Sequence, residues 1–140
     1  MEKFKRGYTA GVFDVFHIGH LNLLRNAKEL CDYLIVGVNS DELVETYKHK
    51  KTIQSLKDRM DIVSSIRYVD LAVENFTLDK MSAWEKYHFD VIFIGDDWKG
   101  NERWAQTEKE LALVGVKVVY LPHTAGISSS IIRENIEKKG

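Results

Sequence analysis

Five short apolar runs, rich in β-branched and aromatic residues, recur along the chain and limit the folds it can adopt. They are YTAGVF (8–13), YLIVGV (33–38), VDLAV (69–73), DVIFIG (90–95) and KVVYL (117–121). Runs of this length and composition indicate buried strands. A helical pattern follows each run. The alternation predicts an α/β, Rossmann-like fold: a doubly wound, parallel five-stranded sheet in a single domain over residues 1–140.

Apolar residues three to four positions apart predict the helices. The first helix is marked by Ile18, Leu21, Leu24, Ala27 and Cys31, and the second by Met60, Val63 and Ile66 after Ser55. Two more cover about 79–88 and 101–114, and the last starts near Ser128. Cys31 is the only cysteine, so we expect a buried thiol, no internal disulfide and a cytoplasmic protein.

The charges nearly cancel, with 20 basic and 21 acidic residues. Such a balance produces no overall field that would attract nucleic acid or an anionic membrane. The N-terminus lacks the apolar segment of a signal peptide, and no apolar run approaches the length of a membrane span. We therefore expect neither partner, and any anion site must be local.

In open parallel sheets, ligands bind at the carboxyl ends of the strands. Asp14, His17, Gly19 and His20 follow the first run, and the two imidazoles, three residues apart, share one face at the start of a helix. Free N–H groups and the helix dipole attract phosphate there, and Gly19 would let a phosphate approach. Two alternatives remain open: one structural and one surface histidine, or a zinc pair without an evident third ligand.

Two further segments point to phosphate. HTAGISSSII (123–132) turns at Gly126 and places three hydroxyls, Ser128, Ser129 and Ser130, at a helix start. They indicate a second phosphate-binding helix N-terminus, although a plain N-cap remains an alternative. Lys48, Lys50 and Lys51 lie in an expected exposed loop, YKHKKT. This loop is either a lid that carries charge to phosphates or a solvated segment.

Four motifs in order resemble those of a known family. GVFDVFHIGH (11–20) is similar to the HxGH signature of the nucleotidyltransferase superfamily. IRYVD (66–70), GDDW (95–98) and GISSS (126–130) resemble motifs of its cytidylyltransferase family, in particular of the members that act on glycerol 3-phosphate. The similarity extends from about residue 8 to residue 136.

The resemblance implies roles for individual residues. His17, His20, Lys48 and Lys50 would be catalytic, with Asp14 orienting the histidine turn. The nucleotide would contact Val12, Phe13, Asp14, Gly19, Arg59, Arg67, Asp97, His123, Thr124, Gly126, Ile127, Ser128, Ser129 and Ser130. The acceptor would contact Asp41, Lys48, Phe76 and Lys80.

The resemblance also implies a reaction. A cytidylyl group would pass from CTP to a small phospho-alcohol, giving CDP-glycerol, a cell-envelope polymer precursor, from glycerol 3-phosphate. The ionised acceptor phosphate would attack the α-phosphorus without a general base, and Mg²⁺ would accompany the triphosphate. We expect a homodimer paired through the RYVD segment and an apolar face of Ile62, Ile66 and Val69.

Other acceptors remain open: choline phosphate, ethanolamine phosphate or a sugar phosphate. So do an adenylyltransferase and a non-catalytic nucleotide-binding module. Two departures from the family pattern bear on the choice, because His123 stands where the family has arginine and Phe76 is the aromatic nearest to a family tryptophan. No extra pocket for a bulky acceptor is evident, which favours a small polyol phosphate.

Overall fold

A computed structural model describes residues 3–96 and 99–139. Five parallel strands form one sheet in the order β3-β2-β1-β4-β5. Their bounds are β1 Phe4–Gly11, β2 Cys31–Asn39, β3 Leu71–Asn75, β4 Val91–Gly95 and β5 Lys117–Leu121. The chain proceeds to one side of β1 and then returns to the other, so the strand order reverses between β1 and β4. The sheet predicted from the apolar runs is confirmed.

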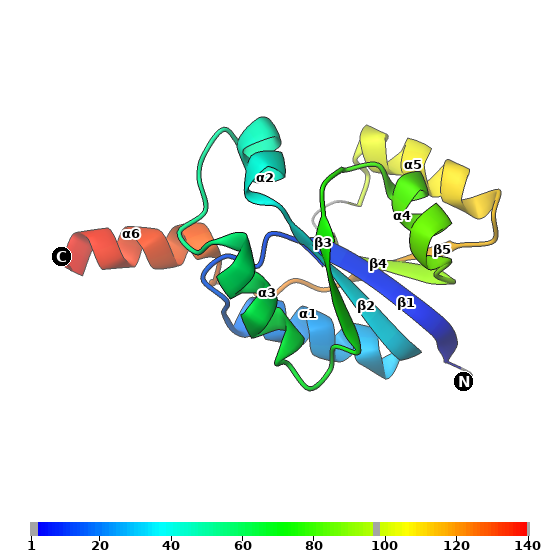
Figure 1. The fold of residues 1–140 in the computed structure, drawn as a ribbon, viewed down its shortest axis with the longest axis horizontal. Coiled ribbons are helices and arrows are strands. Elements are labelled where there is room, and N and C mark those ends of the chain that lie inside the picture. The colour runs from blue at the N-terminus through cyan, green and yellow to red at the C-terminus, as the bar shows by residue number, and fades with distance from the viewer. Residues whose placement is uncertain (1–2, 97–98, 140) are drawn as a thin grey trace.

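Six helices accompany the strands in the described part of the chain. They are α1 Ile18–Glu29, α2 Asp41–Lys48, α3 Leu56–Ser64, α4 Lys80–Tyr87, α5 Glu102–Ala112 and α6 Ser129–Lys139. Figure 1 shows α1 and α3 on one face of the sheet and α4 and α5 on the other. None of these helices is long and apolar enough to cross a membrane.

Each face of the sheet has its own apolar core. Leu24 of α1 and Val63 of α3 pack in one, and Leu111 of α5 packs with Tyr8 and Ile92 in the other. Cys31 is fully buried, as expected, but it is the first residue of β2 and does not belong to the preceding helix. The helix ends earlier because Leu30 is its C-cap.

The helix α2 was not predicted, because only Val44 among its eight residues is buried. Ser40 caps its start, and His49 ends it in the left-handed conformation with φ of 57°. Lys48 is therefore the last residue of a helix and is not part of a free loop. The helix therefore fixes the backbone position of Lys48.

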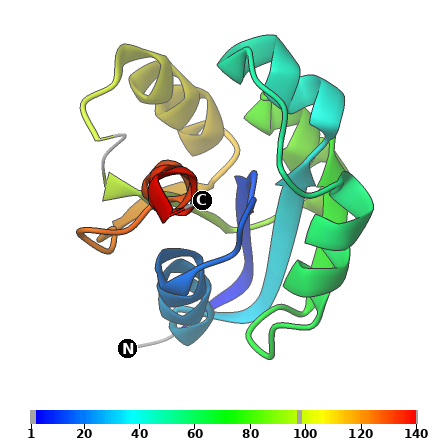
Figure 2. The same cartoon turned by 90° about the vertical axis from the view of Figure 1, so that its left-hand side faces the viewer.

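The carboxyl-terminal edge of the sheet gathers the segments that carry the predicted site. Figure 1 shows α6 projecting from this edge with its C-terminal end pointing away from the sheet, and Figure 2 looks along α6 from that end. The turns after β1 and β2 leave the sheet at the same edge, since the strands are parallel. Residues that are 115 positions apart in sequence, Asp14 and Ser129, are consequently hydrogen-bonded.

Candidate active site

The loop after β1 has a strained backbone. Phe13 and Val15 adopt positive φ angles of 53° and 49°. This region is unfavourable for a bulky or β-branched side chain and costs on the order of 1–3 kcal/mol per residue. The surroundings hold the loop in place: the Phe13 ring is buried, and the Val15 amide donates to Oε1 of Gln54 at 3.0 Å. Such strain is typical of functional loops.

Asp14, between these two residues, joins three segments. Its buried carboxylate accepts hydrogen bonds from the amides of Ile53 (2.8 Å) and Gln54 (2.9 Å) and from the Arg133 guanidinium (2.7 Å). Burial alone would raise the pKa of Asp14, but these three bonds bring it below its ordinary value. The carboxylate thus orients the 51–54 segment and α6 instead of the histidine turn that the family resemblance implied.

The two histidines form a reciprocal cap at the start of α1. Nδ1 of His17 accepts a hydrogen bond from the Gly19 amide at 3.0 Å, and Nδ1 of His20 accepts one from the His17 amide at 3.2 Å. A ring nitrogen that accepts an N–H bond carries no proton, so each neutral ring has its proton on Nε2. Both rings are therefore hydrogen-bond donors at Nε2.

The same environment keeps the rings uncharged. Burial lowers the pKa of His17, and it lowers the pKa of His20 to about 3, with further contributions from His17 and Lys48 that Asp14 partly offsets. The two rings stack with their centroids 3.8 Å apart. Two protonated rings at this distance would repel each other, so stacking favours the neutral forms. At neutral pH, the pair supplies neutral donors and no base.

Gly19 has a different purpose from the one expected. A Cβ atom at this position would lie 2.8 Å from Cε1 and 3.0 Å from Nδ1 of His17. The space that a side chain would need is occupied by the histidine ring and is not open to phosphate. Glycine is needed here because it lets His17 turn back onto the first helical turn.

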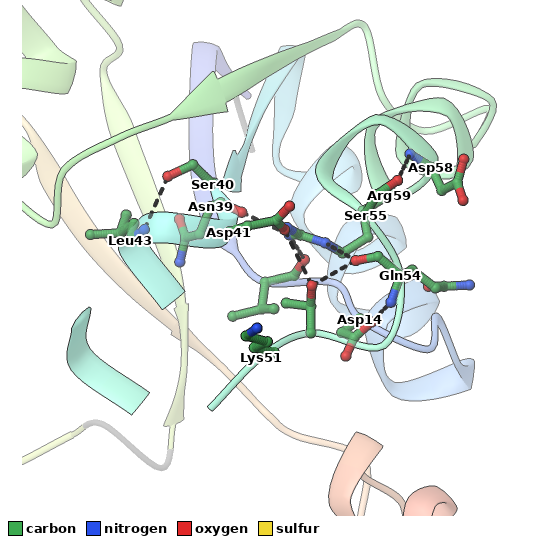
Figure 3. A network of polar contacts seen from close by, with 12 residues as sticks. Asp14, Asn39, Ser40, Asp41, Leu43, Lys51, Gln54, Ser55, Asp58 and Arg59 are labelled. Carbon is green, nitrogen blue, oxygen red and sulfur yellow. Dashed lines mark hydrogen bonds and ion pairs between the residues drawn. The ribbon is translucent and has the colours of Figure 1, made fainter. Parts of the chain in front are cut away.

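Arg59 lies beneath the site and not in it. Its side chain is fully buried, and its guanidinium donates to the carbonyl oxygens of Val12 (2.8 Å), Asn39 (2.7 Å) and Gln54 (3.1 Å). It also forms an ion pair with Asp41. Figure 3 shows this network joining the ends of β1 and β2 to the 51–54 segment. The expected contact between Arg59 and the nucleotide is thus replaced by a positioning role.

A cavity of about 220 Å³ opens above this network. Its polar and charged lining comprises Asp14, His20, Lys48, Lys50, Lys51, Thr52, Ser129, Ser130 and Arg133. Four cationic side chains thus face one carboxylate that is already bound to an arginine. The pKa of Lys48 is lowered first by burial and then by Lys50 and Arg133, with Asp14 opposing them. The cavity is suited to a polyphosphate.

The three serines at the start of α6 make different contacts. Oγ of Ser128 accepts from the Ile131 amide at 3.1 Å and is an ordinary cap. The Ser129 hydroxyl donates to the Asp14 carbonyl, and Ser129 and Ser130 line the cavity. The expected glycine turn is present, since Gly126 has φ of 79°. Ser128 is thus the N-cap that the sequence offered as one interpretation, whereas Ser129 and Ser130 border the cavity.

A second cavity, of about 500 Å³, adjoins the first. The two share Ala10, Gly11, Val12 and Lys48. The second is lined further by side chains from α2, α4 and α5, among them Tyr47, Asp79, Lys80, Arg103, Trp104, Thr107 and Glu110. The expectation that the chain has no additional pocket was wrong, because α5 turns a polar face toward the sheet edge.

The RYVD motif lies at the opposite edge of the sheet. Arg67 precedes β3, and its guanidinium lies 4.9 Å from the centroid of the Tyr68 ring and donates to the Tyr68 hydroxyl. Asp70 accepts from the Leu34 amide (2.7 Å) and pairs with Lys28 (2.6 Å). Within one chain, Arg67 therefore does not reach the nucleotide site for which it was proposed, and the motif joins β2, β3 and α1.

The remaining predicted residues are not among those that line the two cavities. Asp41 is held by Arg59 and Thr52, and Phe76 is 62% exposed after β3. Thr124 accepts a hydrogen bond from Asn22 of α1. The other predicted residues outside the lining of both cavities are His17, Gly19, His123, Gly126, Ile127 and Ser128. Asp97 falls outside the described residues.

His123 forms a short contact with an acidic neighbour. Its Nδ1 lies 2.6 Å from Oδ1 of Asp96, which follows β4. The contact with His123 lowers the pKa of Asp96. His123 is therefore tied to the end of the neighbouring strand, β4.

Sequence reasoning missed several lining residues. Arg133 lies four residues after Ser129, so a helical projection of 129–139 would have placed both on one face. Arg103, Thr107 and Glu110 likewise share one face of α5. No sequence signal shows that this face borders a cavity. Among the described residues, no group of three or more His, Cys, Asp or Glu could hold a metal ion.

The chain is similar in sequence and in fold to known proteins. A family model described as cytidylyltransferase-like matches residues 8–135. A glycerol-3-phosphate cytidylyltransferase of Staphylococcus aureus is 38% identical over 96% of this chain and 97% of its own length. An FAD synthase of Thermococcus kodakarensis is 35% identical over 84% of this chain and 80% of its own. A lipopolysaccharide core biosynthesis protein of Thermoplasma volcanium superposes with a TM-score of 0.76 at 29% identity, covering 86% and 98% of the two chains.

The histidine cap predicts the protonation state of both rings. We expect His17 and His20 to be neutral, with the proton on Nε2, at pH 7, and His20 to remain neutral at pH 5, because its pKa is lowered to about 3. Long-range ¹H–¹⁵N spectra of the rings measure both the tautomer and the charge. The urea-unfolded protein, whose histidines titrate near pH 6.5, is the control.

Because the unfolded chain binds this proton more readily, the His20 contribution to stability is complete above about pH 6.5 and decreases as the pH falls toward 3. An Nδ1–H tautomer, or a cationic His20 at pH 5, would contradict the arrangement.

Proposed function

The chain belongs to the cytidylyltransferase-like family, and we propose that it transfers a cytidylyl group from CTP to glycerol 3-phosphate, releasing pyrophosphate and forming CDP-glycerol. The observation that carries the proposal is the cavity beside α1. The neutral His20 ring and four cationic side chains line it at the strand ends, and the His17 ring stacks on His20 beside it. These imidazole and cationic groups are suited to stabilising negative charge on phosphoryl oxygens and not to removing a proton.

The reaction needs positioning more than acid–base chemistry. An ionised oxygen of the acceptor phosphate forms a bond to the α-phosphorus, and the bond between the α-phosphorus and the bridging oxygen to the β-phosphate breaks. The Nε2–H groups of His17 and His20 donate to the phosphoryl oxygens as charge moves among them, and Lys50 and Arg133 bind the leaving pyrophosphate. No proton has to be removed.

Lys48 connects the two substrates. Among the described residues it is the only charged one that lines both cavities, so it can contact the acceptor phosphate and the nucleotide together. The acceptor occupies the second cavity, where Lys80 is a second cation. Burial lowers the pKa of Lys80 to about 8, an effect that neighbouring Asp79 opposes. At pH 7 this lysine is mostly protonated and gains from an anionic ligand.

Magnesium would arrive with the substrate. Among the described residues, the carboxylate that borders the phosphate cavity is Asp14, whose oxygens already accept from two amides and Arg133. The donor set does not provide a resident magnesium site, and we propose that triphosphate oxygens and water hold the ion.

We propose further that the enzyme is a cytoplasmic homodimer paired through the RYVD edge. Ile66 and Val69, which were expected to form an apolar interface, pack largely against the core of their own chain. The support lies instead in Tyr33 and Leu71, each 40% exposed at that edge, and in exposed Arg67. The buried thiol of Cys31 suits a reducing compartment.

Release of pyrophosphate tests the reaction. With purified protein and Mg²⁺, we expect turnover of CTP with glycerol 3-phosphate and slower turnover when ATP replaces CTP. Omitting the acceptor is the control for hydrolysis. Equal or faster turnover with ATP would contradict the nucleotide assignment, and no turnover with any pair would favour a binding module.

His17 offers a matched pair of variants. His17→Ala removes the donor and the cap, whereas His17→Asn removes the Nε2–H donor but supplies a good capping side chain. We expect kcat to fall by on the order of 10²–10³ in both, the effect of losing one preorganised donor. Only His17→Ala should also lose about 1 kcal/mol of stability.

His20→Ala should lower kcat to a similar extent. Measuring kcat and Tm on the same preparations separates the donor role from a structural one. A folded His17→Ala/His20→Ala double variant with full activity would end the donor interpretation.

Sedimentation tests the dimer. We expect the mass of two chains at micromolar concentration, and a shift toward the monomer in Arg67→Glu if this edge forms the interface. Lys57→Glu, on exposed α3 outside the RYVD segment, is the charge-matched control. A single-chain mass for the parent protein would refute the pairing.

A further inference from the structure

The second cavity is larger than the proposed acceptor. It measures about 500 Å³. Glycerol 3-phosphate has roughly ten non-hydrogen atoms and would fill at most about 300 Å³, at the volume of about 30 Å³ that a water molecule occupies in the liquid. Space therefore remains beyond the three-carbon chain, on the side away from the phosphate cavity.

One face of α5 borders this space. Arg103, Thr107 and Glu110 follow one another at intervals of four and three residues, so they lie in one row along the helix. Half-buried Trp104 packs against the second core and presents an aromatic surface to the same cavity. A donor, a hydroxyl, an acceptor and an aromatic surface thus occur together.

These side chains are available for a ligand. Among the described residues, the Arg103 guanidinium and the Lys80 ammonium have neither a hydrogen bond nor an ion pair. Glu110 accepts only a long bond of 3.4 Å from its own helix, from Gln106. Asp79, the remaining acidic residue, caps α4 through the Met81 amide and the Ser82 hydroxyl. Arg103 and Glu110 therefore supply a donor and an acceptor to this cavity from the same helix.

The charge of the cavity selects the chemistry of the ligand. Three cations, Lys48, Lys80 and Arg103, outnumber the two carboxylates, Asp79 and Glu110, in its described lining. The excess positive charge disfavours the trimethylammonium group of choline phosphate. A chain of hydroxyl groups fits better, because each hydroxyl both donates to a carboxylate such as Glu110 and accepts from a guanidinium such as Arg103. An aromatic side chain such as Trp104 can pack against the C–H groups of such a chain.

We propose that the α5 row of Arg103, Thr107 and Glu110 binds the distal hydroxyls of the acceptor, and that the enzyme uses phosphorylated polyols longer than glycerol 3-phosphate at least as efficiently. This inference rests on the proposed cytidylyl transfer and adds the substrate class and the residues that select it. The reacting phosphate stays at Lys48, and the extra carbons extend toward α5.

The test measures kcat/KM for three acceptors with saturating CTP: glycerol 3-phosphate, D-ribitol 5-phosphate and choline phosphate. We expect the parent enzyme to use ribitol 5-phosphate at least as well as glycerol 3-phosphate and to use choline phosphate poorly. Arg103→Gln and Glu110→Gln should each lower kcat/KM for ribitol 5-phosphate about tenfold. They should change the value for glycerol 3-phosphate less than threefold and leave KM for CTP unchanged.

Lys109→Gln is the control on the same helix, because Lys109 is exposed and does not line the cavity. A tenfold preference of the parent enzyme for glycerol 3-phosphate, efficient use of choline phosphate, or equal effects of all three variants would overturn the inference while leaving cytidylyl transfer intact. Absence of pyrophosphate release with every acceptor would instead overturn the proposed function, and the inference with it.

Discussion

The buried guanidinium of Arg59 is the contact on which the site geometry depends. A cation without access to water must have its donors satisfied, and here the partners are carbonyl oxygens at the ends of β1 and β2, the Gln54 carbonyl and Asp41. One side chain therefore fixes two strand ends and the 51–54 segment relative to each other. The amides of that segment in turn hold Asp14, which holds α6 through Arg133. The phosphate cavity is built upward from this base.

The cations of the molecule fall into two groups with different tasks. Arg59 is neutralised by carbonyls and a carboxylate inside the protein, so it contributes structure. Lys48 and Lys50 border a cavity whose described lining has a single, already engaged carboxylate, so their charge remains available to a substrate. The neutral histidines complement the lysines, because they supply directed donors without adding repulsion in a crowded cationic site. A nearly neutral chain can thus carry a strongly cationic pocket.

The sequence determined the layers of the fold more clearly than the details of the site. Apolar runs identify buried strands, and parallel order brings their carboxyl ends together, so the proximity of His20 to the serines of α6 was predictable. The helix α2 was not, because it buries little apolar surface. The roles of Gly19 and Arg59 depend on ring orientation and burial, which no spacing encodes. Within one chain Arg67 lines neither cavity, and the spacing of the motif alone does not show at which end of the strands it lies.

Lys48 stands at the boundary of two cavities, and in the proposed reaction this position would link their occupancy thermodynamically. A single ammonium group shared by two anionic ligands is partly neutralised by whichever binds first, so each ligand reduces the electrostatic benefit left for the other. Linkage makes this antagonism reciprocal and equal in free energy for both ligands. The same sharing favours the state in which the acceptor phosphate and the α-phosphate are joined in one diphosphate, because the ammonium group then interacts with one anionic group in place of two. A residue at a shared wall can therefore weaken the joint binding of the reactants and favour their union.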